Sequence, residues 1–354
     1  MAVSRLMKKS NSYLLPRPRL SDVAKAAGVS LGAASKALSA PDAVRPRTLH
    51  AVQRAVESLG YIPSGAARAL ASRSTEMVGV VLPTISNPVY STFVHELQKT
   101  LAQDGLHLLA LAHEYNRENE VELVERLVRR SVDALIMIGT DHDDRTISLL
   151  NKIGIPHINC WSSDKAPKHG ALGFNNQAAM VKIIDHLVRL GHKRIAMLGG
   201  ETWNNERAQW RLRGVQKAAA AHGIELVKVV TVPLTIAGGQ IGYRQIDPVR
   251  NNVTALVCGT DLQAAGALDA ARTQGVVVPD QLSITGFDDI EMAALLSPAL
   301  TTIHAPIAEL AIATGKAIIG MLQGHGVPKS LSLPTELVIR QSTGPARTKS
   351  AHRN

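Results

Sequence analysis

Aromatic residues, cysteines and long apolar runs are all scarce in this chain of 354 residues, and each scarcity excludes a class of protein. Aromatic side chains make up 3% of the residues, and there are only two cysteines. Cys160 and Cys258 lie in separate apolar segments without CxxC spacing, so we expect core thiols rather than a disulfide or a metal site. No apolar run has the length of a membrane span, and residues 1–19 lack the apolar centre of a signal peptide. We therefore expect a cytoplasmic protein without a membrane partner.

Motifs of the common α/β enzymes are absent as well. The chain contains no GxGxxG dinucleotide fingerprint and no GxSxG nucleophile elbow, and its thirteen histidines show no metal-ligand spacing. These absences predict that the protein is not an enzyme and uses no metal and no cofactor.

Positive charge, by contrast, is concentrated at one end of the chain. The formal net charge is +10, and residues 1–75 carry +9 of it, with twelve Lys or Arg against Asp22, Asp42 and Glu57. Binding to a polyanion requires this kind of asymmetry. We expect residues 1–18 to form a disordered basic arm beside the segment that binds.

The stretch LSDVAKAAGVSLGAASKAL, residues 20–38, predicts a helix-turn-helix. Apolar positions recur at helical spacing on both sides of Gly28, which supplies the positive φ that ends a helix. Ser21 and Ser30 stand where each helix would be capped at its N-terminus. A third helix is predicted to run from Pro46, and its apolar stripe consists of Leu49, Val52, Val56 and Leu59.

Three motifs in fixed order, SDVAKAAGVS, LGYIP and ARALASRST, resemble the amino-terminal domain of the lactose-repressor (LacI/GalR) family of bacterial regulators. The similarity extends to about Thr343. It implies an all-α helix-turn-helix DNA-binding domain over residues 19–62, a hinge over 63–75 and a periplasmic-binding-protein-like core over 76–343, with a flexible tail at 344–354.

The core shows unbroken apolar runs that alternate with helical segments from Met77 onward. This alternation predicts α/β architecture with parallel sheets covered on both faces, arranged as two doubly wound lobes. We expect the first lobe to comprise about 76–175 and 305–335, and the second about 176–304 and 336–343.

The resemblance implies that the second helix of the motif, about 31–39, enters the major groove of DNA. Its expected DNA-contacting residues are Ser21, Ser30, Leu31, Gly32, Ser35 and Lys36. In the hinge, Leu70 matches the leucine that the family inserts between base pairs, and the small Ala67 allows close approach. A hinge helix of about seven residues is too short to be stable alone, so we expect it to fold on DNA.

The same resemblance implies a small-molecule effector between the two lobes. Arg211 matches the family's ligand-holding arginine, and Asp261 matches a carboxylate that binds effector hydroxyls while capping the helix that it begins. Trp161 offers a flat face for stacking under a sugar ring. The other expected effector-binding residues are Tyr90, for which a plain core role is the alternative, Thr140, Asn175, which replaces the family's usual Asp, and Phe287.

These features together predict a dimeric, ligand-responsive transcriptional repressor of sugar or sugar-acid catabolism. It would bind a palindromic DNA operator with half-sites about one helical turn apart. Two alternatives stay open. One is the same scaffold with a nucleoside-type corepressor, and the other is a sugar-binding or sugar-processing protein without a role on DNA.

Overall fold

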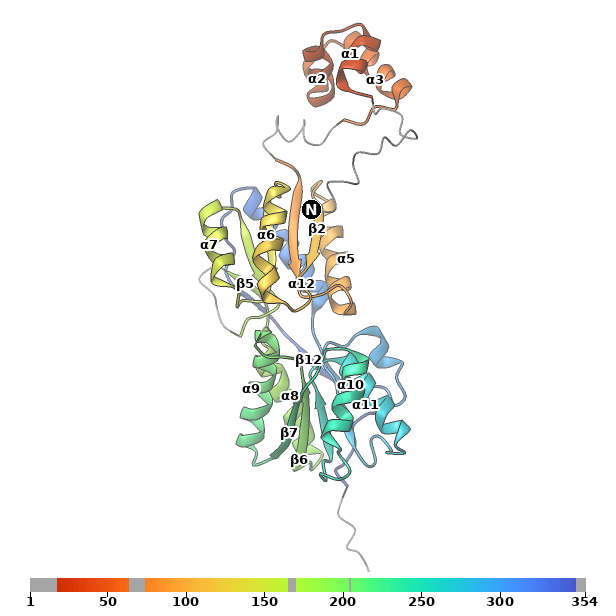
Figure 1. The fold of residues 1–354 in the computed structure, drawn as a ribbon, viewed down its shortest axis with the longest axis vertical. Coiled ribbons are helices and arrows are strands. Elements are labelled where there is room, and N and C mark those ends of the chain that lie inside the picture. The colour runs from red at the N-terminus through yellow and green to blue at the C-terminus, as the bar shows by residue number, and fades with distance from the viewer. Residues whose placement is uncertain (1–17, 64–73, 165–169, 204, 348–354) are drawn as a thin grey trace, which may run out of the picture. The chain divides into compact units, whose positions relative to one another are not determined.

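A computed structural model describes residues 18–63, 74–164, 170–203 and 205–347 of the chain (Figure 1). The chain divides into two compact units, Met1–Thr75 and Glu76–Asn354, and each is described by itself.

The first unit is built from three helices, α1 (Leu20–Ala27), α2 (Leu31–Ser39) and α3 (Pro46–Leu59), with a short 3-10 turn, η2 (Pro41–Ala43), between the last two. Small side chains fill its centre, which allows the helix axes to approach closely. The fully buried core residues are Val23, Ala24, Ala34, Ala37, Val52 and Ala55. The predicted α3 stripe was wrong at Leu59, which is 36% exposed, because Ala55 takes the buried position one turn earlier.

The ends of these helices follow from single residues. Gly28 and Gly60 end α1 and α3 in the left-handed region, at φ of 65° and 60°. The predicted cap at Ser30 is confirmed, since its side chain accepts a hydrogen bond from the backbone N–H of Ala33. The predicted cap at Ser21 is wrong. The helix begins two residues earlier, at Leu20 with Arg19 as the N-cap, and the Asp22 carboxylate accepts a hydrogen bond from the Arg19 N–H at 2.8 Å.

The second unit begins with a six-stranded parallel sheet in the order β11-β5-β4-β3-β1-β2. Its strands are β1 (Met77–Leu82), β2 (His107–Ala112), β3 (Ala134–Ile138), β4 (His157–Cys160), β5 (Ala171–Phe174) and β11 (Leu331–Leu333). Its helices are α5 (Pro88–Ala102), α6 (Glu120–Arg129), preceded by η3 (Arg117–Asn119), α7 (Asp144–Ile153) and α12 (Ile307–Leu322). We call this part lobe 1.

Lobe 2 has a four-stranded parallel sheet in the order β7-β6-β8-β9. Its strands are β6 (Arg194–Gly199), β7 (Glu225–Thr231), β8 (Ala255–Cys258) and β9 (Ser283–Thr285). Its helices are α8 (Asn176–Arg189), α9 (Glu206–Ala221), α10 (Ile236–Ile246) and α11 (Asp261–Thr273), followed by η4 (Glu291–Ala294). Two short strands, β10 (Thr302–His304) and β12 (Glu336–Val338), pair with each other in an antiparallel ladder.

Alternate residues of the strands face opposite layers, as a doubly wound sheet requires. Ile136 of β3 belongs to the core cluster under α5 and α12, whereas its neighbours Leu135 and Met137 pack with α6 and α7. In lobe 2, Ile195 and Leu198 of β6 likewise belong to two different core clusters, one on each face of the sheet. The predicted fold class, a helix-turn-helix unit and two parallel α/β lobes, is therefore confirmed.

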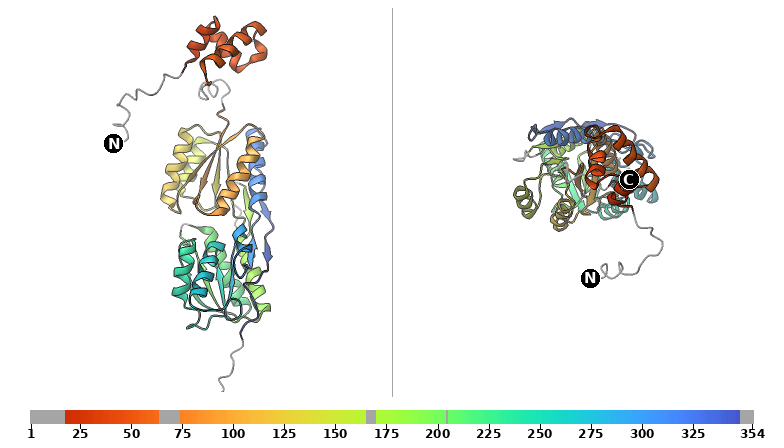
Figure 2. Two further views of the ribbon diagram at one scale, coloured as in Figure 1. Left: turned by 90° about the vertical axis from the view of Figure 1, so that its right-hand side faces the viewer. Right: turned by 90° about the horizontal axis from the view of Figure 1, so that it is seen from above.

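The chain passes between the lobes after β5, after β10 and after β11. Figure 2 shows the last helix, α12, in blue along the side of lobe 1, where it packs against α5. Because both sheets are parallel, the loops after the strands of each lobe gather at one edge of its sheet. These loops carry the candidate site.

Candidate functional site

In the first unit, the outward face of α2 carries the residues expected to touch DNA. Leu31 is 55% exposed, and Gly32, Ser35 and Lys36 are also exposed on the face opposite the buried Ala34 and Ala37. An added Cβ at Gly32 would meet no atom within 4 Å, so the helix surface is open at that point. Ser21 and Ser30 are exposed as well.

Basic side chains are in excess on the surface of this unit. Among residues 18–63 six basic residues stand against Asp22, Asp42 and Glu57, and all six are exposed: Arg19, Lys25, Lys36, Arg45, Arg47 and Arg54. A surface with this excess attracts a polyanion. The remaining basic charge of residues 1–75, and the hinge positions Ala67 and Leu70, lie outside the described residues.

In the second unit, a cavity with two chambers lies between the lobes. The inner chamber has a volume of about 30 Å³, and the outer chamber about 340 Å³. Asn87, Tyr115, Asn205 and Leu234 border both chambers, so the two chambers adjoin each other. Loops that follow β1, β2 and β4 of lobe 1 face loops that follow β6, β7, β8 and β9 of lobe 2 across it.

Arg211, on α9, lies in the wall of the inner chamber, where its side chain makes several contacts with the protein. Its Nε donates to Asn176 Oδ1 at 3.0 Å, its Nη1 donates to the Gly259 carbonyl at 2.6 Å, and its Nη2 lies 3.6 Å from the Asp288 carboxylate. The guanidinium also lies over the ring of Phe287, 3.6 Å from the centroid. Arg211 therefore ties together three segments that meet at the cavity.

Asp288 is the acidic residue of the inner wall, and it is 6% exposed. Burial raises the pKa of its carboxyl to about 7, against the opposing effect of the Arg211 charge. Its backbone φ of 115° lies in the region that favours glycine, so the loop after β9 holds it in a strained conformation.

The aromatic residues of the inner chamber pack on one another. Trp161 is 1% exposed, and its ring centroid lies 4.7 Å from that of Tyr90 and 5.2 Å from that of Phe93. The structure places Trp161 and Tyr90 in the cavity wall, where the Trp161 ring packs on those of Tyr90 and Phe93.

Asp261 departs from its predicted roles. Thr260 caps α11, since its hydroxyl accepts from the Gln263 N–H, and Asp261 is the first residue of the helix. Its fully buried carboxylate accepts hydrogen bonds from the Ile290 N–H at 2.9 Å and from the Thr302 hydroxyl at 2.5 Å. Burial raises the pKa of Asp261 well above its usual value, and the charge of Asp288 adds to this effect. Asp261 thus joins the loop after β9 to β10, and its place at the cavity is taken by Thr260.

Three other expected effector residues also lie outside the cavity lining. Asn175 is exposed and caps α8 by accepting from the Ala178 N–H at 2.7 Å. Phe287 is fully buried beneath Arg211. Thr140 uses its backbone N–H to contact the other lobe, donating to Glu206 at 3.0 Å.

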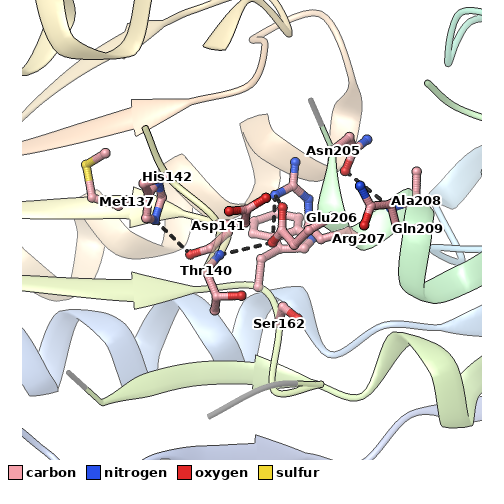
Figure 3. A network of polar contacts seen from close by, with 12 residues as sticks. Met137, Thr140, Asp141, His142, Ser162, Asn205, Glu206, Arg207, Ala208 and Gln209 are labelled. Carbon is pink, nitrogen blue, oxygen red and sulfur yellow. Dashed lines mark hydrogen bonds and ion pairs between the residues drawn. The ribbon is translucent and has the colours of Figure 1, made fainter. Parts of the chain in front are cut away.

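That contact belongs to a network between the lobes that is shown in Figure 3. Glu206 and Arg207, at the start of α9, are 7% and 5% exposed, and Arg207 Nη1 donates to both Glu206 oxygens at 3.0 and 3.3 Å. Burial opposes it, but the negative charge of Glu206 raises the pKa of Arg207. The pair lies against Gly139, where an added Cβ would come within 2.6 Å of Arg207 Nη1. Arg207 also lines the inner chamber.

Comparison with known proteins identifies the family. A family model described as bacterial regulatory proteins, lacI family, matches residues 19–64, and a periplasmic binding protein-like domain matches residues 184–343. The HTH-type transcriptional regulator reg1 of Streptomyces lividans is 30% identical over 341 residues, which is 93% of this chain and 97% of that protein. This chain belongs to the LacI family. It is a DNA-binding transcriptional regulator and not an enzyme.

Two solved LacI-family structures are similar along the whole chain. The lac repressor dimer bound to operator and the anti-inducer ONPF is 26% identical, with 93% of this chain and 100% of that chain covered and a TM-score of 0.82. A complex of the transcriptional regulator CelR with cellobiose is 26% identical, with 92% and 100% coverage and a TM-score of 0.69.

The LacI-family chain has several cavity residues that the sequence analysis did not select, above all Arg207, Tyr115, Asn205 and Asp288. Asp288 stands in the FDDIEM segment, Asn205 is the last residue of the loop that follows β6, and Arg207 is the second residue of α9. Their position just after strands of a parallel sheet was the available signal.

Other groups of this LacI-family chain are structural. Cys160 and Cys258 are free and buried, as predicted, and burial raises the pKa of both thiols. Within the described part of the chain, no three His, Cys, Asp or Glu side chains gather closely enough to hold a metal ion. The helices of the described residues are all too short or too polar to cross a membrane.

Proposed function

We propose that this regulator is a dimeric repressor that binds a palindromic operator and releases or retains it according to a sugar effector held between the lobes. The observation that carries the proposal is the polar cavity between the lobes, bordered by Arg207, Arg211, Asp288, Tyr90 and Thr260. Clefts of this kind, with a few convergent polar groups, are the usual small-molecule sites of α/β proteins.

The relatives support both halves of the proposal. One similar structure is a dimer bound to operator DNA, and another holds cellobiose. In this chain the exposed face of α2 supplies the surface for a major groove. Leu31 would contact a thymine methyl, and Lys36 would reach guanine or phosphate.

The test is a gel shift of the full chain against the DNA upstream of its own gene, with a panel of neutral sugars, sugar acids and nucleosides added in turn. We expect a shifted complex that one of the sugars dissociates or strengthens. The variant Lys36→Ala should lower the affinity for operator about five- to a hundredfold, whereas Lys217→Ala, an exposed lysine of the second unit, should not. A response to a nucleoside alone would replace the sugar effector, and the absence of any shift would refute the role on this DNA.

A further inference from the structure

His142 is a buried histidine of lobe 1, in the loop between β3 and α7, and its side chain is 1% exposed. Its Nδ1 lies 2.9 Å from a carboxylate oxygen of Glu120, the first residue of α6. Its Nε2 lies 3.2 Å from the carbonyl oxygen of Gly139. Both ring nitrogens therefore face oxygens that accept hydrogen bonds, whereas a neutral imidazole has only one N–H to donate.

These contacts require one proton more than a neutral histidine and a carboxylate carry together. The additional proton lies in the 2.9 Å contact between His142 and Glu120, because without it two lone pairs would face each other there. Burial acts against both charges, but the hydrogen bond to Glu120 raises the pKa of His142, and the same bond lowers the pKa of Glu120. The pair is therefore an imidazolium bound to a carboxylate.

The imidazolium contacts a peptide group that also contacts the other lobe. The Gly139 carbonyl, which accepts from His142, and the N–H of Thr140 belong to the same planar peptide. This N–H donates to the Glu206 carboxylate of lobe 2 at 3.0 Å (Figure 3). A hydrogen bond accepted at the C=O polarises the peptide and strengthens the bond that its N–H donates. A positive charge in lobe 1 and a negative charge in lobe 2 thus bind opposite sides of one peptide.

Several elements place charged or titratable groups around this loop. They are Glu120 of α6, Arg117 of η3, Asp141 and Asp143 of the loop itself, Arg145 of α7, His113 after β2, and Glu206 and Arg207 of α9. Burial lowers the pKa of His113 to about 4, against the opposing charge of Glu120, so His113 does not compete for the proton near neutral pH. The charge of Glu206 favours the imidazolium from across the boundary between the lobes.

We propose that the His142–Glu120 pair is a proton-binding site whose protonation strengthens the contact between the two lobes. Loss of the proton sets an imidazole lone pair against the Glu120 carboxylate, so the ring turns away and the Gly139 carbonyl loses its charged donor. The contribution of His142 is complete below about pH 6.5, the usual pKa of histidine, and is lost as the pH rises through the raised value. By linkage, closing of the lobes takes up a proton. This inference goes beyond the proposed function, since no effector takes part in it.

Hydrogen exchange of single amides in the full chain, followed by NMR spectroscopy, tests the effect on the contact between the lobes. The protection of the Thr140 amide should fall about tenfold or more between pH 6 and pH 9. The adjacent Gly139 amide donates to Cys160 within lobe 1, and its protection should change less than about twofold. In His142→Gln, which can still donate to a carbonyl but does not titrate, the protection of Thr140 should be the same at both pH values. Equal losses at the two amides would indicate loosening of the whole loop and would overturn the proposal.

Titration of His142 itself tests the reverse linkage. The NMR signal of its ring is the one that His142→Gln removes. Glu206→Gln should lower the pKa of His142, because the opposite charge across the contact is lost. Glu291→Gln, the same change on an exposed residue of lobe 2, should leave this pKa unchanged. An unchanged circular dichroism spectrum shows that each variant is folded.

Two outcomes of this titration would overturn the proposal. One is a pKa of His142 in Glu206→Gln equal to that of the wild type, and the other is a wild-type pKa below the usual 6.5. Either outcome leaves the proposed function standing, because operator binding and the effector are measured independently of this pair.

Discussion

Replacing Arg211 separates a ligand-holding role from a structural one. In the structure Arg211 is 7% exposed, and it is the charged partner of the buried Asp288 carboxylate. Removing Arg211 leaves the Asp288 carboxyl buried without its partner and leaves Asn176 Oδ1 and the Gly259 carbonyl without their donor, which together cost about 3–5 kcal/mol. We therefore expect Arg211→Met to destabilise the second unit by about this amount at pH 7.5. Replacing both partners, in Arg211→Met with Asp288→Asn, should restore about 2 kcal/mol or more of that loss.

The pH dependence gives an independent measure of the same pair. The folded-state pKa of Asp288, about 7, lies above the usual 3.8, so the neutral carboxyl favours the folded state. Its contribution to stability is therefore complete below about pH 4 and is lost as the pH rises through 7. Without Arg211 this pKa should rise further, and the stability of Arg211→Met should keep falling at pH values above those where the wild type levels off. The buried Asp261 carboxyl, whose pKa the charge of Asp288 also raises, contributes to the same slope, so the variants are compared in an Asp261→Asn background.

Urea unfolding followed by circular dichroism at several pH values measures these free energies, and calorimetry with the effector measures binding. A single variant within about 1 kcal/mol of the wild type would refute the structural role of Arg211. A double variant whose loss of stability equals the sum of the losses in the two single variants would also refute this role. In either case the loss of effector response in Arg211→Met would be assigned to the ligand alone.

Three further predictions concern other parts of the chain. Gly139→Ala should destabilise the second unit by about 1–3 kcal/mol more than its control Gly275→Ala. Both residues have positive φ, but only at Gly139 would the added Cβ lie within 3 Å of Arg207 and Glu206 atoms. Urea unfolding measures the difference, and equal losses in the two variants would contradict this prediction. Operator affinity should fall with salt at a log–log slope of about −5 to −9, from six to ten phosphate contacts, and a slope shallower than about −2 in a filter-binding titration would exclude this electrostatic basis. Leu70→Ala should weaken operator binding and bending in gel-shift assays while effector binding persists, and unchanged affinity and bend angle would reduce residues 64–71 to a linker.

Much of the fold follows from local sequence signals. Gly28 and Ser30 end and begin their helices as predicted, because a left-handed φ or a side-chain cap depends only on a few neighbouring residues. The apolar runs that became β1, β3 and β6 are continuous because both faces of a parallel sheet are buried. The short strands β5 and β11 were not predicted, since Gly173 and Ser332 interrupt their apolar runs.

The candidate site was predicted only in part. Tyr90, Trp161 and Arg211 lie in the cavity wall, and Leu31 and Lys36 lie on the exposed face of α2. Those predictions depended on the place of each residue in a motif, which sets the loop or helix face that carries it. The hydrogen bonds and ion pairs of each side chain, by contrast, depend on partners that are distant in the sequence.

Asp261 and Arg207 show this limit most clearly. The sequence by itself determined that both residues begin helices after strands, because capping and periodicity are local. Only the tertiary structure decided that the Asp261 carboxylate turns inward to Thr302 and Ile290, and that Glu206, paired with Arg207, accepts a hydrogen bond from Thr140 of the other lobe. The physical reason is that these contacts join residues that are up to 66 positions apart, as between Thr140 and Glu206, and buried charges settle wherever the folded chain supplies opposite charges and hydrogen bonds.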